Sequence, residues 1–258
     1  MPAAFAIGAH PDDIEFFMSG TLTLLGEAGY ELHYMNLANG DLGTTQYDRV
    51  TAARVRREEG RAAAASIGAV YHESLCRDLE IIYDLSLLAK LTAVMREVAP
   101  QILLTHSPVD YMEDHTNTCR LAVSAAFARC MPNLITEPPR DAIFEKVTIY
   151  HAQPNGNRDP LRRLVEPDLY VDTTGVIERK VQMLAQHESQ KRWLDESQGL
   201  GAYLQTLRDL DAENGRLSGL FAYAEGWRRH LHLGFCGPDD DPLRTALQDK
   251  ILMAGPPR

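Results

Sequence analysis

The alternation of apolar and polar residues along the chain predicts strands and helices in turn. The apolar run 3–8 is typical of a buried strand, and the spacing of Ile14, Phe17, Leu22 and Leu25 after it predicts a helix over 13–28. Further apolar runs predict strands over 31–38, 69–72, 101–105, 146–150 and 169–172. Helical spacing with suitable ends predicts helices over 50–67, 85–98, 116–130 and 176–194.

This order of elements predicts an α/β fold with a Rossmann-like, mostly parallel sheet and helices on both faces. The 258 residues contain no internal repeat and no linker, so we expect a single domain over 1–258. The tail 238–258 begins with a stretch rich in Pro and Asp, and we expect it to be peripheral.

Composition narrows the class of protein and its partners. A hydrophobic content of 45% and a charged content of 24% are ordinary for a globular protein. The net charge of -10 argues against nucleic acid and against an anionic membrane surface, because both attract basic proteins. No apolar run approaches the ~20 residues of a membrane helix, and no signal peptide is recognisable. The four cysteines are scattered, which favours reduced thiols and a cytoplasmic location.

Chemistry-bearing residues follow two of the predicted strands. The segment 10–13, His-Pro-Asp-Asp, comes directly after the first strand, and the segment 110–115, Asp-Tyr-Met-Glu-Asp-His, follows the strand 101–105. The carboxyl ends of parallel strands meet at one edge of the sheet, where ligands bind in open α/β folds. His10, Asp13 and His115 can therefore converge.

Two imidazoles and one carboxylate are a three-ligand set that leaves a coordination position open, as expected of a catalytic zinc. Fe²⁺, Co²⁺ and Mn²⁺ are compatible with the same donors. The alternative is structural: Asp13 and Asp114 cap their helices, and the histidines beside them are incidental.

The chain also resembles the LmbE/PIG-L family of zinc-dependent N-deacetylases. The resemblance rests on Ala-His-Pro-Asp-Asp at 9–13 followed by Glu15, and on Asp-x-x-x-Asp-His ending at His115. Supporting similarities lie at residues 40–44, Arg56, Glu59, Asp78, 187–190 and 223–226. Members of this family remove acetyl groups from N-acetylglucosamine units. The resemblance therefore implies a zinc hydrolase acting on a small amino-sugar amide, and a homo-oligomer is compatible with it.

The resemblance also implies roles for individual residues. His10, Asp13 and His115 would hold the metal, Asp12 would be the general base, and Asp114 would orient a ligand imidazole. Residues that would contact substrate are Arg56, Asp78, Tyr111, Met112, His151 and His187, with His187 near the rim of the site.

One position departs from the family. Many members carry a histidine three residues before the last ligand, where it stabilises the oxyanion. Here that residue is Met112, which has no proton to donate. Tyr111, His106 and His151 are the candidate replacements, and Met112 itself is a candidate contact for an apolar part of the substrate.

Two other functions stay open. One is an amidase or deacylase on the same scaffold acting on a non-sugar or thiol-conjugate amide, with the loops 39–48 and 152–166 deciding the substrate. The other is a nucleotide-binding or non-enzymatic domain whose Asp-rich loop binds a cation. The first turn lacks the Gly-x-Gly-x-x-Gly pattern, which argues against the second.

Overall fold

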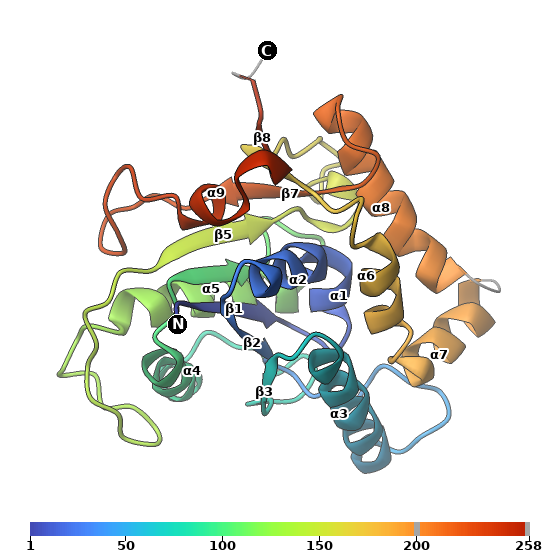
Figure 1. Ribbon diagram of the computed structural model, residues 1–258. Coiled ribbons are helices and arrows are strands. Elements are labelled where there is room, and N and C mark those ends of the chain that lie inside the picture. Colours follow the sequence, from blue (N-terminus) through green and yellow to red (C-terminus); the bar gives the residue numbers. More distant parts are fainter. Residues whose placement is uncertain (199–201, 256–258) are drawn as a thin grey trace.

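A single eight-stranded sheet runs through the part of the chain that the computed structural model describes, residues 1–198 and 202–255. The strand order is β3-β2-β1-β4-β5-β7-β6-β8, and Figure 1 labels all of these strands except β4 and β6. The strands are β1 Ala3–Gly8, β2 Glu31–Asn36, β3 Val70–His72, β4 Ile102–Thr105, β5 Thr148–Ala152, β6 Leu169–Asp172, β7 Ala224–Arg229 and β8 Ile251–Met253. The α-helices are α1 Asp13–Phe17, α2 Ser19–Glu27, α3 Arg49–Ser66, α4 Leu85–Val98, α5 Glu113–Ala128, α6 Ile177–Leu184, α7 Glu188–Gln198, α8 Ala202–Ser218 and α9 Pro242–Leu247.

The prediction of a mostly parallel sheet is confirmed. Strands β3, β2, β1, β4 and β5 are parallel neighbours. Strand β7 is antiparallel to both β5 and β6, and β8 is antiparallel to β6. Because β1 and β4 are parallel neighbours, the turns that follow them lie at the same edge of the sheet.

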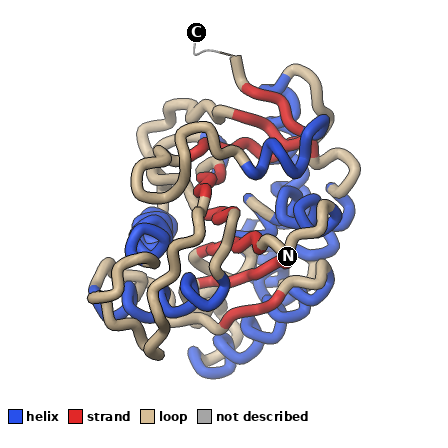
Figure 2. The backbone as a smooth tube through the Cα atoms, turned by 60° about the vertical axis from the view of Figure 1, so that its left-hand side comes forward, coloured by secondary structure: helices blue, strands red, loops and turns tan. Residues whose placement is uncertain are grey.

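Hydrophobic cores cover both faces of the sheet, and Figure 2 shows the strands between flanking helices. Phe5 and Ile7 of β1 pack on one face with α4 and α5 through side chains such as Leu91 and Leu121. Ala4 and Ala6, which alternate with them, belong to the core of the other face, which α1 and α2 cover. Burial on both faces explains why β1 is a continuous apolar run instead of an alternating one.

Several element boundaries differ from the predictions. The helix expected over 13–28 is two helices, because Met18 leaves helical geometry at φ −138°. The helix expected over 176–194 is likewise divided into α6 and α7, with residues 185–187 between them. Helix α5 begins at Glu113, three residues earlier than expected, and so includes Asp114 and His115 in its first turn.

The C-terminal part contains elements that no pattern predicted. Helix α8 and strand β7 were missed, since β7 reads Ala-Glu-Gly-Trp-Arg-Arg and has no apolar run. Part of the tail packs on the sheet: β8 pairs with β6, and Leu243 and Leu247 of α9 are buried in the core. Among the described residues, no helix is both long enough and apolar enough to cross a membrane.

Candidate metal and catalytic site

The turn after β1 presents one imidazole and two carboxylates. Asp13 Oδ2 accepts hydrogen bonds from the backbone N–H groups of His10 (2.7 Å) and Ala9 (3.1 Å), which fixes one oxygen and turns the other, Oδ1, away from the turn. Asp12 has a φ of 116°, a left-handed conformation that is costly for any residue with a Cβ. The neighbouring carboxylates of Asp12 and Asp13 therefore face different partners, Tyr203 and His115 respectively.

The second cluster meets the first one at this edge. His115 Nε2 lies 3.2 Å from Asp13 Oδ1, and His115 Nδ1 lies 3.1 Å from Asp110 Oδ1. His10 Nε2 lies 3.0 Å from Asp114 Oδ2, which leaves His10 Nδ1 on the side of Asp13, 3.5 Å from its Oδ2. The structure thus brings together the residues that the sequence singled out around His10 and His115.

These side chains fit a metal ion. One ligand atom each from His10, Asp13 and His115 lies within 4.8 Å of the other two. Both nitrogens of His115 are buried and lack a hydrogen bond of acceptable geometry, although carboxylate oxygens are close. A metal ion coordinated by Nε2 would satisfy this buried imidazole.

Electrostatics point the same way. Burial alone would lower the pKa of His10, but Asp114 and Asp13 raise it to about 9. Burial would also lower the pKa of His115, but Asp13 and Asp110 raise it to about 10. Burial opposes ionisation of Asp13, yet the facing imidazoles hold the pKa of this carboxyl well below its usual range. The site therefore attracts positive charge strongly, as a metal site should.

Asp12 has different partners. Its Oδ2 accepts a hydrogen bond from the hydroxyl of Tyr203 at 2.8 Å, and its Oδ1 lies 3.5 Å from Nη2 of Arg56. All three side chains are buried. Burial raises the pKa of Asp12, although the charge of Arg56 opposes this.

Two residues to which the family resemblance assigned substrate contacts, Arg56 and Asp78, form hydrogen bonds within the protein instead. Arg56 is buried and donates to the carbonyl oxygen of Pro11 and to the side chain of Gln190. Asp78 accepts hydrogen bonds from Gly40 N (2.7 Å) and Leu42 N (3.0 Å). The structure uses them to hold the catalytic turn and the loop after β2.

His187 and His151 also lie away from any exposed rim. His187 is fully buried, with Nε2 3.4 Å from Oε2 of Glu15, so the rim position expected for it is wrong. It lies between α6 and α7 and faces Glu15 of α1. His151, on β5, is buried with Nε2 2.9 Å from Nδ1 of His230 and Nδ1 3.0 Å from the carbonyl oxygen of His106.

Tyr111 and Leu79 are exposed beside the metal-ligand candidates. The Tyr111 ring lies 5.9 Å from that of His115, and 57% of the residue is exposed. Leu79 donates its N–H to Asp114 Oδ2 at 2.8 Å and is 70% exposed. Met112 is half-buried and precedes the first residue of α5. Tyr111 and Leu79 are thus exposed residues in contact with His115 and Asp114.

Three participants were not assigned these roles from the sequence. Tyr203 lies in a helix that the sequence did not reveal, and no local signal connects it with Asp12. His106 stacks on His115 with ring centroids 4.2 Å apart and lies 3.2 Å from Asp13. Asp110 belonged to the recognised cluster, and only the structure shows that it faces the second nitrogen of His115.

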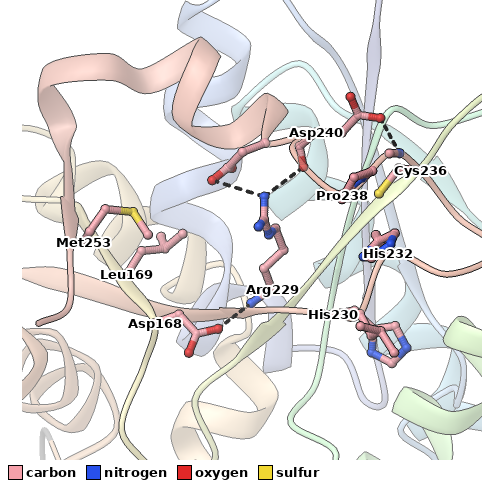
Figure 3. Close-up of a pocket in the computed structure, with 12 residues that line it drawn as sticks. Asp168, Leu169, Arg229, His230, His232, Cys236, Pro238, Asp240 and Met253 are labelled. Atoms are coloured by element: carbon pink, nitrogen blue, oxygen red, sulfur yellow. Dashed lines mark hydrogen bonds and ion pairs between the residues drawn. The ribbon is translucent and has the colours of Figure 1, made fainter. Parts of the chain in front are cut away.

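A pocket of about 340 Å³ lies elsewhere, beyond the end of β7 (Figure 3). Its charged groups satisfy one another: Arg229 donates to the carbonyl oxygen of Asp240 at 3.0 Å and lies 3.7 Å from the Asp241 carboxylate. The Asp168 carboxylate accepts the Arg229 backbone N–H at 3.0 Å. None of the candidate metal ligands and none of their hydrogen-bond partners lines this pocket; His230, the partner of His151, does.

Comparison with known proteins agrees with the site. Residues 5–126 match the family model described as PIG-L, GlcNAc-PI de-N-acetylase. A 4-oxalmesaconate hydratase of Pseudomonas putida is 30% identical over 186 residues, 69% of this chain and 70% of that protein. A diacetylchitobiose deacetylase of Thermococcus kodakarensis is 27% identical over 190 residues, covering 71% and 68%.

The fold also matches solved structures. An N,N'-diacetylchitobiose deacetylase from Pyrococcus horikoshii superimposes with a TM-score of 0.73 and 24% identity, over 90% of this chain and 84% of that one. Because the family model covers both clusters of the site, and because the hydratase is similar over more than two thirds of its length, the chain belongs to the PIG-L (LmbE) family.

Proposed function

We propose that this protein is a metal-dependent N-deacetylase acting on an N-acetylglucosamine-type sugar or conjugate. The observation that carries the proposal is the convergence of His10, Asp13 and His115 on one point beside the separately held carboxylate of Asp12. The deacetylase among the similar proteins supports the amide substrate.

His10 Nδ1, Asp13 Oδ1 and His115 Nε2 are the atoms that would hold the metal, with zinc the ion that such donors favour. When bound, the metal would polarise the amide carbonyl and lower the pKa of water at the site to ~7. Asp114 and Asp110 would orient the two imidazoles from their other nitrogens.

Asp12 would take the proton from the attacking water. Its neighbour Asp13 is committed to the imidazoles, whereas Asp12 contacts none of the three ligand candidates in a hydrogen bond. Burial raises its pKa, and a base whose pKa lies closer to the working pH holds and releases protons more readily.

The oxyanion donor that many relatives supply at position 112 would have to come from another residue. Tyr111 is exposed beside His115, and partial desolvation together with the charges of Asp13 and Asp110 raises its pKa to about 12, so that the phenol keeps its proton. We therefore assign the hydrogen bond to the oxyanion to Tyr111 in this proposal. Met112 and Leu79 would contact an apolar part of the substrate.

The test combines metal analysis with an assay for amine release. Purified protein should contain about one zinc per chain and release primary amine, detected with fluorescamine, from N-acetylglucosamine or its conjugates. Asp12→Asn should lower the rate of release by about a thousandfold and keep the zinc, whereas Asp239→Asn, an exposed carboxylate in the tail, should change neither. Zinc without release from any sugar amide would contradict the sugar assignment and favour a non-sugar or thiol-conjugate amide. Absence of zinc binding would contradict the whole proposal.

Two observations favour a second function, the hydration of a carbon–carbon double bond. The hydratase is 30% identical to this chain, and Met112 leaves the site without the donor that amide hydrolysis uses in many relatives. Adding water to a polarised double bond would need the same metal and base but no leaving amine. Loss of ultraviolet absorbance from 4-oxalmesaconate, dependent on Asp12 and on metal, would identify this activity.

A further inference from the structure

The orientation of Asp12 depends on side chains far away in the sequence. Its backbone is in a left-handed conformation with φ 116° and ψ −21°, and although it occupies the cap position of α1, its side chain makes no capping hydrogen bond. The turn itself therefore does not fix the carboxylate. A strained backbone of this kind persists only where surrounding contacts hold it.

Tyr203 supplies the hydrogen bond that the turn does not. Its hydroxyl donates to Asp12 Oδ2 at 2.8 Å, in a contact between α8 and the beginning of α1. The ring is 2% exposed, belongs to a small core with Val181, Leu184 and Leu207, and meets the Phe16 ring edge-on at 5.3 Å. The phenol is thus unable to swing away, and its direction fixes that of the carboxylate.

The second oxygen of Asp12 is left in a different state. Arg56 Nη2 lies 3.5 Å from Oδ1, too far for a strong hydrogen bond, because this guanidinium donates to the carbonyl oxygen of Pro11 and to Gln190. Oδ2 accepts a hydrogen bond from a neutral donor, whereas Oδ1 has only a distant cation. The hydrogen bond from Tyr203 is therefore the contact that orients this carboxylate.

We propose that Tyr203 is a positioning residue that aims the Asp12 carboxylate, and this inference rests on the role of Asp12 in the proposed function. Tyr203 itself contacts no metal-ligand candidate. It lies outside residues 5–126, which the family model matches, so the family model does not cover this contact. Burial, together with the charge of Asp12, raises the pKa of Tyr203 well above its usual range, and the hydroxyl therefore remains a donor.

The test uses Tyr203→Phe, which removes the hydroxyl and keeps the ring. We expect kcat to fall about 10- to 100-fold while KM and zinc content stay within twofold, as for loss of one hydrogen bond to a charged group. In the Asp12→Asn background, Tyr203→Phe should change the residual rate by less than twofold, because the hydroxyl acts through Asp12. A crystal structure of Tyr203→Phe should show the Asp12 carboxylate rotated or in more than one conformer.

Tyr150→Phe is the matched control. This buried tyrosine also donates to a carboxylate, Asp241 Oδ1 at 2.6 Å, but in a contact unrelated to Asp12, so its loss should lower stability and leave kcat unchanged. A wild-type kcat in Tyr203→Phe, an equal loss of rate in both backgrounds, or an unmoved Asp12 in the crystal would overturn the inference. Full activity in Asp12→Asn would instead overturn the proposed function, while the crystal structure still decides the inference.

Discussion

Zinc binding should displace two protons from the metal-free protein at pH 6.5. The pKa of His10 is raised to about 9 and that of His115 to about 10, so both imidazoles carry their protons almost completely at this pH. Asp13 is already ionised, because its pKa is held well below its usual range. Since a metal requires the neutral imidazole, each histidine must lose its proton on binding.

The magnitude separates this site from an ordinary pair of histidines. Two imidazoles with the unperturbed pKa of ~6.5 would be half-protonated at pH 6.5 and would release about one proton together. The shifted pair should release about two. The same groups should make zinc affinity rise with pH by about a hundredfold per unit between pH 6.5 and 8.5, while both protons are still bound in the free protein.

Calorimetric titration with zinc in buffers of different ionisation enthalpy measures the number directly. At pH 6.5 free zinc interferes little, because its own water ionises near pH ~9. Asp114→Asn removes the largest contribution that raises the pKa of His10, and release should fall below that of the wild type. Asp239→Asn should leave it at two. Release of one proton or fewer by the wild type, with zinc bound, would refute the electrostatic reasoning.

The same histidines make the stability of the metal-free protein fall as pH rises, whereas zinc affinity rises with pH. Their folded pKa values are raised above the unfolded value of ~6.5, so their contribution is complete below pH ~6.5 and is lost as pH rises towards 9 and 10. Metal-free protein should therefore show a falling Tm across this range.

Three further substitutions test other parts of the structure. Lys180 is fully buried, with Nζ 2.7 Å from a carboxylate oxygen of Asp211 and of Glu225. Lys180→Met should lower the free energy of unfolding in urea by ~3–5 kcal/mol. Lys146→Met, at an exposed ion pair, is the control and should change it little. Asp110→Asn should weaken zinc binding by about 10- to 100-fold in a chelator competition, because it faces the second nitrogen of His115; unchanged affinity would argue against that role. Tyr111→Phe should lower kcat for amide hydrolysis by about a hundredfold, and Met112→His in that background should restore about tenfold or more of it; an unchanged kcat in Tyr111→Phe would contradict the oxyanion role assigned to Tyr111.

The half of the site that the sequence revealed lies within two short segments. His10 and Asp13 follow β1, His115 follows β4, and the rule that parallel strands place their carboxyl ends together was sufficient to predict their convergence. Even there, local pattern could not decide which carboxylate serves which imidazole. Asp114 faces His10 and Asp110 faces His115, although Asp114 is the sequence neighbour of His115.

The other half depends on contacts that no local pattern reports. Arg56 has the sequence environment of a residue on a charged helix, yet it is buried because Gly40 and Gly43 leave room for its guanidinium, and a Cβ at Gly40 would lie 2.6 Å from its Cδ. Strand β7 is buried without an apolar run because Lys180 compensates the charge of Glu225, and the N–H groups of Gly20 and Thr21 donate to its carboxylate. A polar residue whose partner is distant in the sequence looks like a surface residue until the fold is known.

The C-terminal part therefore contacts the proposed catalytic residues and also contributes to the core. Tyr203 of α8 contacts Asp12 directly, and Gln190 of α7 holds the guanidinium that faces the same carboxylate. Glu225 of β7 accepts from the first turn of α2, next to the helix that follows the catalytic turn. A chain shortened to residues 5–126 would keep every candidate metal ligand and lose all three contacts. Relatives with the same candidate metal ligands can therefore differ in the contacts that hold the residue corresponding to Asp12. Both a deacetylase and a hydratase are similar to this chain, and we expect their reactions to differ through such contacts.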